Sequence, residues 1–297
     1  MAGAGKGGQD VVEFSRADID ALAQILRAAA RSEILPRFRR LDAGAVRTKS
    51  GPLDLVTEAD EAAEAAIFEA LAERLPSALL VGEESAARNP ALLEGLERAE
   101  LAIVVDPIDG TSNYAAGVPL FGVMAAALCR GEVVASVILD PVTDHAAIAA
   151  KGGGAWTEDQ DGRVQPLMVA DATGLAHMTG YVSTRYLPSP LREHVMARLH
   201  EVAAHWDFRC AAHEYRMVAG GQCHFLMFNR LLPWDHLPGW LLHREAGGFA
   251  AHFDGTDYRA GDRGGGLLYA PDRQSWGRLR ETLIGATCAY PAGVDAS

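Results

Sequence analysis

Val104-Val105-Asp106-Pro107-Ile108-Asp109-Gly110-Thr111-Ser112-Asn113 is the segment from which the rest of this chain is interpreted. The five residues 101–105 are apolar and mostly β-branched, which predicts a short buried strand ending at Asp106. Pro107 then separates two carboxylates, and its fixed φ helps to hold both on one side of a turn. Gly110 allows a ligand to approach the backbone closely. The Thr-Ser-Asn that follows offers hydroxyl, amide and N–H groups suited to a phosphate.

The two carboxylates of this segment predict a metal site. Close carboxylates repel each other at neutral pH unless a cation lies between them. Mg²⁺ prefers oxygen ligands, usually one or two carboxylates with water and a substrate phosphate. A solvated Asp-Pro-x-Asp-Gly turn explains the same residues without any ligand, and the segment alone does not separate the two interpretations.

The composition excludes some classes of protein. The 297 residues are 49% hydrophobic and 22% charged, typical of a soluble globular protein with a sizeable core in one or two domains. A net charge of −12 argues against a general binder of nucleic acid or anionic membranes. The cysteines lack C-x-x-C spacing, which argues against a disulfide framework or a zinc site; they are Cys129, Cys210, Cys223 and Cys288.

The sequence also predicts a cytoplasmic location. No apolar run approaches the 18 residues of a membrane span. Residues 1–10 are rich in glycine and lack the apolar core of a signal peptide, so we expect a disordered tail there.

Periodicity predicts helices and strands in the first half. Helices are expected after the capping patterns at Ser15–Asp18 and Thr57–Asp60. Strands are expected at residues 78–81 and 146–150, and a hairpin at 121–129 and 133–139. The glycines at 152–154 lack the Gly-Lys-Ser/Thr of a phosphate loop, which favours a turn with Trp156 packed beyond it.

The second half begins near residue 165. Strands are expected at residues 178–183, 225–228, 249–253 and 266–270, and helices at 191–202, 211–221 and 275–284. A further helix is expected to start near Asp235, because Pro238 is best tolerated in a first turn.

Four segments together resemble the inositol monophosphatase family, in the family's order. The first is the central Asp106–Tyr114 segment, DPIDGTSNY. The others are KSGPLDLVTEAD at 49–60, GEES at 82–85, and Trp234-Asp235 followed by EAGG at 245–248. They extend over most of residues 10–290. The resemblance implies a layered α/β fold, an α/β/α/β/α sandwich, with one phosphatase domain over residues 11–290. Residues 11–160 would hold most metal ligands, and residues 165–290 would supply Asp235 and the substrate wall.

The resemblance also implies a reaction and its residues. The reaction is hydrolysis of a small-molecule phosphate monoester, with two or three Mg²⁺ ions, frequent sensitivity to Li⁺ and a homodimeric assembly. Asp60 and Thr111 would position the attacking water, and Glu83 would act with them as a metal ligand. The implied metal ligands are Glu83, Asp106, the carbonyl of Ile108, Asp109 and Asp235. The implied phosphate and substrate contacts are Gly110, Thr111, Ser112, Lys49, Arg209 and His236.

The substrate wall departs from the family pattern. The family commonly has Gly-Ser/Thr-Ala where this chain has Arg209-Cys210-Ala211. Inositol-specific members carry a glutamate seven residues before the Trp-Asp aspartate, and this chain has Phe228 there, followed by Asn229. A site that lacks a hydroxyl-binding group loses discrimination for that hydroxyl. Histidinol phosphate, a sugar bisphosphate and a nucleotide 3′-phosphate therefore remain alternatives to inositol phosphate.

Two other functions stay open. Some bacterial members of the family are implicated in binding transcription or RNA machinery, although the acidic net charge argues against direct RNA contact. A protein that binds Mg²⁺ without turnover is the third possibility.

Overall fold

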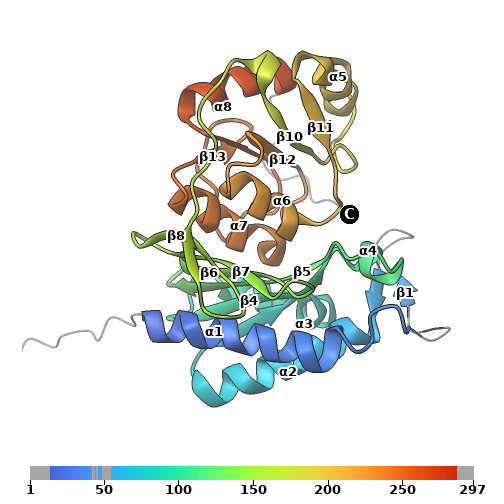
Figure 1. Cartoon of the computed structure of the whole chain (residues 1–297), viewed down its shortest axis with the longest axis vertical. Coiled ribbons are helices and arrows are strands. Elements are labelled where there is room, and N and C mark those ends of the chain that lie inside the picture. Colours follow the sequence, from blue (N-terminus) through green and yellow to red (C-terminus); the bar gives the residue numbers. More distant parts are fainter. Residues whose placement is uncertain (1–13, 42–43, 45, 49–54, 286–297) are drawn as a thin grey trace, which may run out of the picture.

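The computed structural model describes residues 14–41, 44, 46–48 and 55–285. The predicted tail, Lys49 and residues 286–297 lie outside this range. Figure 1 shows five layers, from α1 and α2 at one end to α5 and α8 at the other. The prediction of an α/β/α/β/α sandwich is confirmed. The helices are α1 Arg16–Ala29, α2 Glu58–Arg74, α3 Glu83–Arg88, α4 Thr111–Ala115, α5 Leu191–Arg198, α6 Ala211–Ala219, α7 Pro233–Glu245 and α8 Arg273–Leu279.

The first sheet has seven strands in the order β3-β4-β5-β6-β7-β8-β9. Only β3 and β4 are parallel in it, and the other neighbours are antiparallel. Its strands are β3 Leu79–Gly82, β4 Ala102–Asp109, β5 Gly122–Cys129, β6 Glu132–Asp140, β7 His145–Ala150, β8 Gly154–Glu158 and β9 Val164–Pro166. The predicted hairpin is β5–β6. A separate antiparallel pair, β1 Val46–Thr48 and β2 Leu55–Thr57, leads into α2.

The second sheet has five strands in the order β11-β10-β12-β14-β13. Strands β11, β10 and β12 run parallel, whereas β14 is antiparallel to both β12 and β13. The strands are β10 Thr179–Val182, β11 Ala204–Trp206, β12 Phe225–Phe228, β13 Phe249–His252 and β14 Leu267–Ala270. Three-residue β11 was not predicted, because so short a strand has no detectable alternation.

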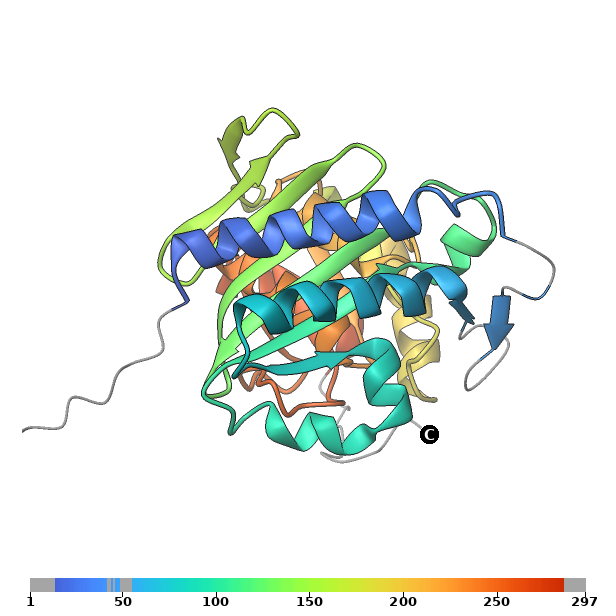
Figure 2. The same cartoon turned by 90° about the horizontal axis from the view of Figure 1, so that it is seen from below.

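Helices cover both faces of the first sheet. Figure 2 shows α1 and α2 side by side across its outer face, and α7 packs against the inner face, between the two sheets. The apolar side chains of β4 alternate accordingly. Ile103 and Val105 join the core beneath α1 and α2, whereas Ala102 and Val104 join the core shared with α6 and α7. A strand covered on both faces is apolar throughout, which explains the uninterrupted apolar run before Asp106.

Both predicted capping patterns are confirmed. Ser15 and Asp18 form a reciprocal capping box at the start of α1, and Thr57 and Asp60 form another at the start of α2. The two boxes satisfy backbone N–H groups that have no partner within the helix.

The predicted start of α7 near Asp235 is wrong by two residues. The helix begins at Pro233, so Pro233 occupies the first turn and Pro238 lies in the interior. An interior proline lacks one helical hydrogen bond. Nearly all of α7 is buried between the two sheets, and tertiary packing of this extent outweighs the local helix-breaking tendency.

Candidate active site

A bulge in β4 brings Asp106 and Asp109 to the same side of the sheet. Asp106 pairs with Met124 and Asp109 with Gly122, so β4 has one extra residue between the two pairs. In a regular strand, residues three apart point to opposite faces. The extra residue places the side chains of Asp106 and Asp109 on the same face of the sheet. Ile108 then packs into the core beneath α1 and α2. The strand therefore does not end at Asp106 as predicted. It continues through Asp109 because the bulge accommodates Pro107, which has no N–H for the ladder.

Helix α7 supplies the third carboxylate. Oxygen atoms of Asp106, Asp109 and Asp235 all lie within 4.8 Å of one another. Asp106 and Asp109 are buried and Asp235 is half-buried. Burial and the neighbouring carboxylates, including Glu83, raise the pKa of Asp106 well above its usual value, and Asp235 shows the same effect. Three oxygen donors without a compensating cation form a costly arrangement, and this is the donor set that a hard divalent ion stabilises.

Glu83 follows β3, the strand next to β4, and lies near these three carboxylates. It is the first residue of α3, immediately after β3, and β3 is paired in parallel with β4. It is half-buried and lines the same cavity as Asp106, Asp109 and Asp235. Its charge contributes to the raised pKa values of Asp106 and Asp235. Its oxygen atoms do not belong to the group that lies within 4.8 Å.

Asp60 and Thr111 are joined by a hydrogen bond, as the resemblance implied. Thr111 Oγ1 donates to Asp60 Oδ1 at 3.3 Å and lies 3.0 Å from the carbonyl oxygen of Ile108. The backbone N–H of Thr57 donates to Asp60 Oδ2 at 2.8 Å. Asp60 is fully buried, and burial raises its pKa to about 7. A carboxylate with this pKa exchanges a proton readily at neutral pH.

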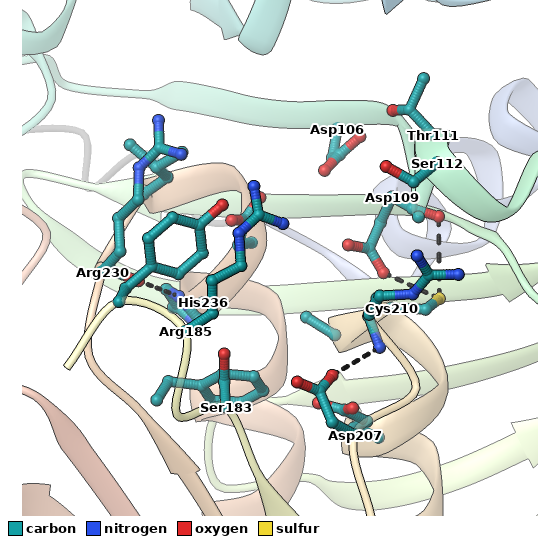
Figure 3. A pocket seen from close by; sticks show the side chains of 18 of the residues that line it. Asp106, Asp109, Thr111, Ser112, Ser183, Arg185, Asp207, Cys210, Arg230 and His236 are labelled. Carbon is teal, nitrogen blue, oxygen red and sulfur yellow. Dashed lines mark hydrogen bonds between the residues drawn. The ribbon is translucent and has the colours of Figure 1, made fainter. Parts of the chain in front are cut away.

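Asp109 is fixed by the start of α6. Ala212 N donates to Asp109 Oδ2 at 2.6 Å, and Cys210 Sγ donates to the same oxygen at 3.0 Å (Figure 3). The thiol occupies the position of the Ser/Thr in the family pattern, and here it donates to the carboxylate. Gly110 has φ +86°, and a Cβ there would lie 3.1 Å from the carbonyl oxygen of Leu120. The turn therefore requires a glycine.

These residues line a cavity of about 180 Å³ between the two sheets. Ser112 and Arg209 line it as well. Of the predicted site residues, only the buried Asp60, which is bonded to Thr111, does not line the cavity among those that the structure describes; Lys49 lies outside them. Several further residues that no sequence motif indicates also line the cavity. They include Ser183, Arg185, Tyr186, Asp207, Glu214 and Arg230.

His236 lies in the wall of the cavity and is almost fully buried. Its Nδ1 is 2.9 Å from the hydroxyl of Tyr215, and its Nε2 is 2.8 Å from the carbonyl oxygen of Arg230. Burial lowers its pKa to about 4, so the ring is neutral at physiological pH. With both nitrogens engaged, the ring presents only its carbon edge and face to a ligand.

Comparison with known proteins identifies the fold and the family. The family model of the inositol monophosphatase family matches residues 14–290. The chain belongs to the inositol monophosphatase family. An inositol-1-monophosphatase of Mesorhizobium japonicum is 35% identical over 209 residues, covering 69% of this chain and 74% of that protein. The Nus factor SuhB of Escherichia coli is 31% identical over 211 residues, covering 70% and 75%.

A solved structure agrees with the architecture. The extragenic suppressor protein SuhB of Bartonella henselae superposes with a TM-score of 0.77 at 26% identity, covering 91% of this chain and 99% of that one. As a member of the inositol monophosphatase family, the chain is a metal-dependent phosphoric monoester hydrolase. Within the described residues, no helix has both the length and the hydropathy needed to cross a membrane.

Proposed function

We propose that this chain hydrolyses a small-molecule phosphate monoester with Mg²⁺ and a water nucleophile. The observation that supports the proposal is the position of three carboxylates. Oxygen atoms of Asp106, Asp109 and Asp235 lie within 4.8 Å of one another, next to the hydrogen-bonded Asp60–Thr111 pair. Phosphoryl transfer depends on positioning and charge neutralisation more than on covalent catalysis. The Asp60–Thr111 pair would position the water, and the three carboxylates would hold the ions that neutralise the phosphate charge.

The proposed metal ligands are Glu83, Asp106, the carbonyl of Ile108, Asp109 and Asp235, for two or three ions. The hydrogen bonds from Cys210 Sγ and Ala212 N both reach Oδ2 of Asp109, and we propose Oδ1 as its metal-binding oxygen. Bound Mg²⁺ would neutralise the phosphate oxygens and acidify the attacking water.

The remaining roles belong to side chains and backbone groups around the carboxylates. Asp60 accepts a hydrogen bond from Thr111, which leaves the lone pairs of Thr111 Oγ1 to orient the water. The N–H groups at Gly110, Thr111 and Ser112 would hold the phosphate, since those at the start of α4 have no partner within the helix. Lys49, Arg209 and His236 are proposed substrate contacts, His236 through its ring rather than its nitrogens.

Phosphate release tests the proposal directly. The panel comprises inositol phosphate, histidinol phosphate, fructose bisphosphate and a nucleotide 3′-phosphate, each with Mg²⁺, with EDTA and with added Li⁺. We expect release that requires Mg²⁺, falls with Li⁺ and is lost in Asp106→Asn. Asp171→Asn, an exposed carboxylate outside the cavity, is the matched control. Release that continues unchanged in EDTA would contradict the metal assignment.

A binding role in transcription is a second candidate, since several relatives are named Nus factor SuhB. Asp106→Asn separates the two candidates, because a pure binding role survives the loss of a metal ligand. A cellular effect that disappears in Asp106→Asn supports hydrolysis. We also propose a homodimer in the cytoplasm, which sedimentation analysis of the full chain and cell fractionation would test.

A further inference from the structure

Three neighbouring strands of the second sheet each lead to an arginine. Strands β11, β10 and β12 lie side by side and parallel, so their carboxyl ends lie at one edge of the sheet. Each strand is followed within three residues by an arginine: Arg209 after β11, Arg185 after β10 and Arg230 after β12. All three arginines line the cavity that holds the acidic group.

Arg185 and Arg230 stack on a single aromatic ring. Their guanidinium carbons lie 4.8 Å and 5.3 Å from the ring centre of Tyr186. In Figure 3, both side chains extend towards the strand that carries Asp106. Neither arginine forms an ion pair with any residue that the structure describes. Stacking holds the planar group through its face and leaves its N–H donors available at the edge.

The backbone around this pair is fixed to β12. Ser183 N donates to the carbonyl of Met227 at 3.0 Å, and the amide of Asn229 donates to the carbonyl of Tyr186. Asn229 itself is buried. The two arginines thus come from segments that are tied together, so their guanidinium groups are held near each other before a ligand arrives, which reduces the entropy cost of binding.

Two carboxylates also line this wall, and each accepts a backbone hydrogen bond. Glu214 accepts a hydrogen bond from Phe208 N at 2.7 Å, and Asp207 accepts one from Arg209 N at 2.8 Å. Phe228, at the position of the inositol-specific glutamate, packs on His236 with ring centres 4.8 Å apart. Besides these two carboxylates, the wall offers an apolar surface and cationic donors, and position 228 has a phenylalanine in place of the inositol-specific glutamate.

We infer that the substrate carries a second anionic group, a phosphate or a carboxylate, which Arg185 and Arg230 bind while the scissile phosphate lies at the acidic group. This inference rests on the proposed phosphatase function. It favours a bisphosphate or a carboxylated sugar phosphate over histidinol phosphate, whose amine is cationic, and over inositol monophosphate. Arg185 and Arg230 are then specificity-determining residues.

A matched set of sugars tests the inference. Phosphate release is measured for glucose 1-phosphate, glucose 6-phosphate, glucose 1,6-bisphosphate and glucuronic acid 1-phosphate. We expect kcat/KM for at least one doubly anionic sugar to exceed that of the singly phosphorylated sugars by about tenfold, the factor of one charge-assisted hydrogen bond. The bisphosphate and the glucuronate distinguish a second phosphate from a carboxylate.

Two variants locate the preference. Arg185→Gln and Arg230→Gln should each reduce the ratio of the two kcat/KM values by about tenfold. Arg192→Gln, an exposed arginine of α5 outside the cavity, should keep the ratio. If the arginines only balanced the charge of the acidic group, every substrate would slow equally and the ratio would not change. That result, or a ratio that survives in both variants, would overturn the inference.

The inference and the proposed function can fail separately. Equal kcat/KM for singly and doubly anionic sugars overturns the inference and leaves the phosphatase function intact. Release from no compound, including p-nitrophenyl phosphate, contradicts the phosphatase function. The same sugars are then stable ligands, so calorimetric titration in Mg²⁺ decides the inference: tighter binding of a doubly anionic sugar supports it, and equal binding overturns it.

Discussion

Asp235→Asn should stabilise the metal-free protein while it abolishes the response to Mg²⁺. In EDTA the three carboxylates have no cation between them. At 4.8 Å and an effective dielectric constant of 20, two full charges repel by about 3.5 kcal/mol. Because raised pKa values leave the carboxylates partly protonated, we expect the free energy of unfolding to rise by about 2 kcal/mol, or roughly 3 °C in Tm.

The effect should depend on pH with a defined sign. Burial and the nearby carboxylates raise the pKa of Asp235 in the folded protein. The folded state then keeps protons that the unfolded chain releases, so without metal stability falls as pH rises above the usual carboxylate range. Asp235→Asn removes the contribution of this carboxylate to that loss of stability. Its benefit should be smaller at pH 5, where more of the carboxylates carry protons, than at pH 8.

Thermal unfolding in EDTA and in Mg²⁺, at both pH values, measures these quantities. Wild type should gain stability from Mg²⁺ at pH 8, and Asp235→Asn should gain little. Asp171→Asn, exposed and outside the cavity, controls for the loss of one negative charge. An Asp235→Asn protein that unfolds at the wild-type temperature in EDTA, or that keeps the full Mg²⁺ response, would refute the shared metal site.

Three further substitutions test separate contacts. Thr111→Val removes the hydroxyl that bonds the buried carboxylate of α2, and kcat should fall about 100-fold with little change in KM. Cys210→Ala removes a donor to Asp109, so the Mg²⁺ concentration for half-maximal activity should rise about tenfold, whereas Cys210→Ser should stay close to wild type. Gly239→Ala places a Cβ 2.1 Å from the ring of Tyr215, which should cost about 3 kcal/mol of stability, seen as a lower Tm by calorimetry.

The sequence predicted the order of elements because the main helices and strands have strong local signals. Capping boxes and apolar periodicity identified α1 and α2, and the continuous apolar run identified β4. The bulge was missed, since a strand interrupted by Pro107 resembles a strand that has ended. The three-residue spacing of Asp106 and Asp109 does not indicate whether a turn or a bulge brings both side chains to one face of the sheet. The register of β4 with β5 shows that it is a bulge.

The substrate wall was less predictable, because its residues have no local pattern. Arg185 and Arg230 are 45 positions apart in the chain and become neighbours only through the parallel pairing of β10 and β12. A lone arginine after a short strand is usually a solvated charge. Recognising the pair requires the strand order, which neither composition nor periodicity contains. Pro238 was misjudged for a related reason, since its tolerance depends on the burial of α7.

The position of α7 between the sheets also determines when the chain becomes active during its synthesis. Asp106 and Asp109 belong to the first sheet, but Asp235 reaches them only after α7 has packed against it. A ribosome-bound chain that lacks residues 233–245 lacks Asp235, one of the proposed metal ligands, whatever the state of its first half. With Asp235 as a ligand, as proposed, hydrolysis would begin only after most of the polypeptide has emerged, and recovery of turnover after dilution from denaturant would report the packing of α7 against the first sheet.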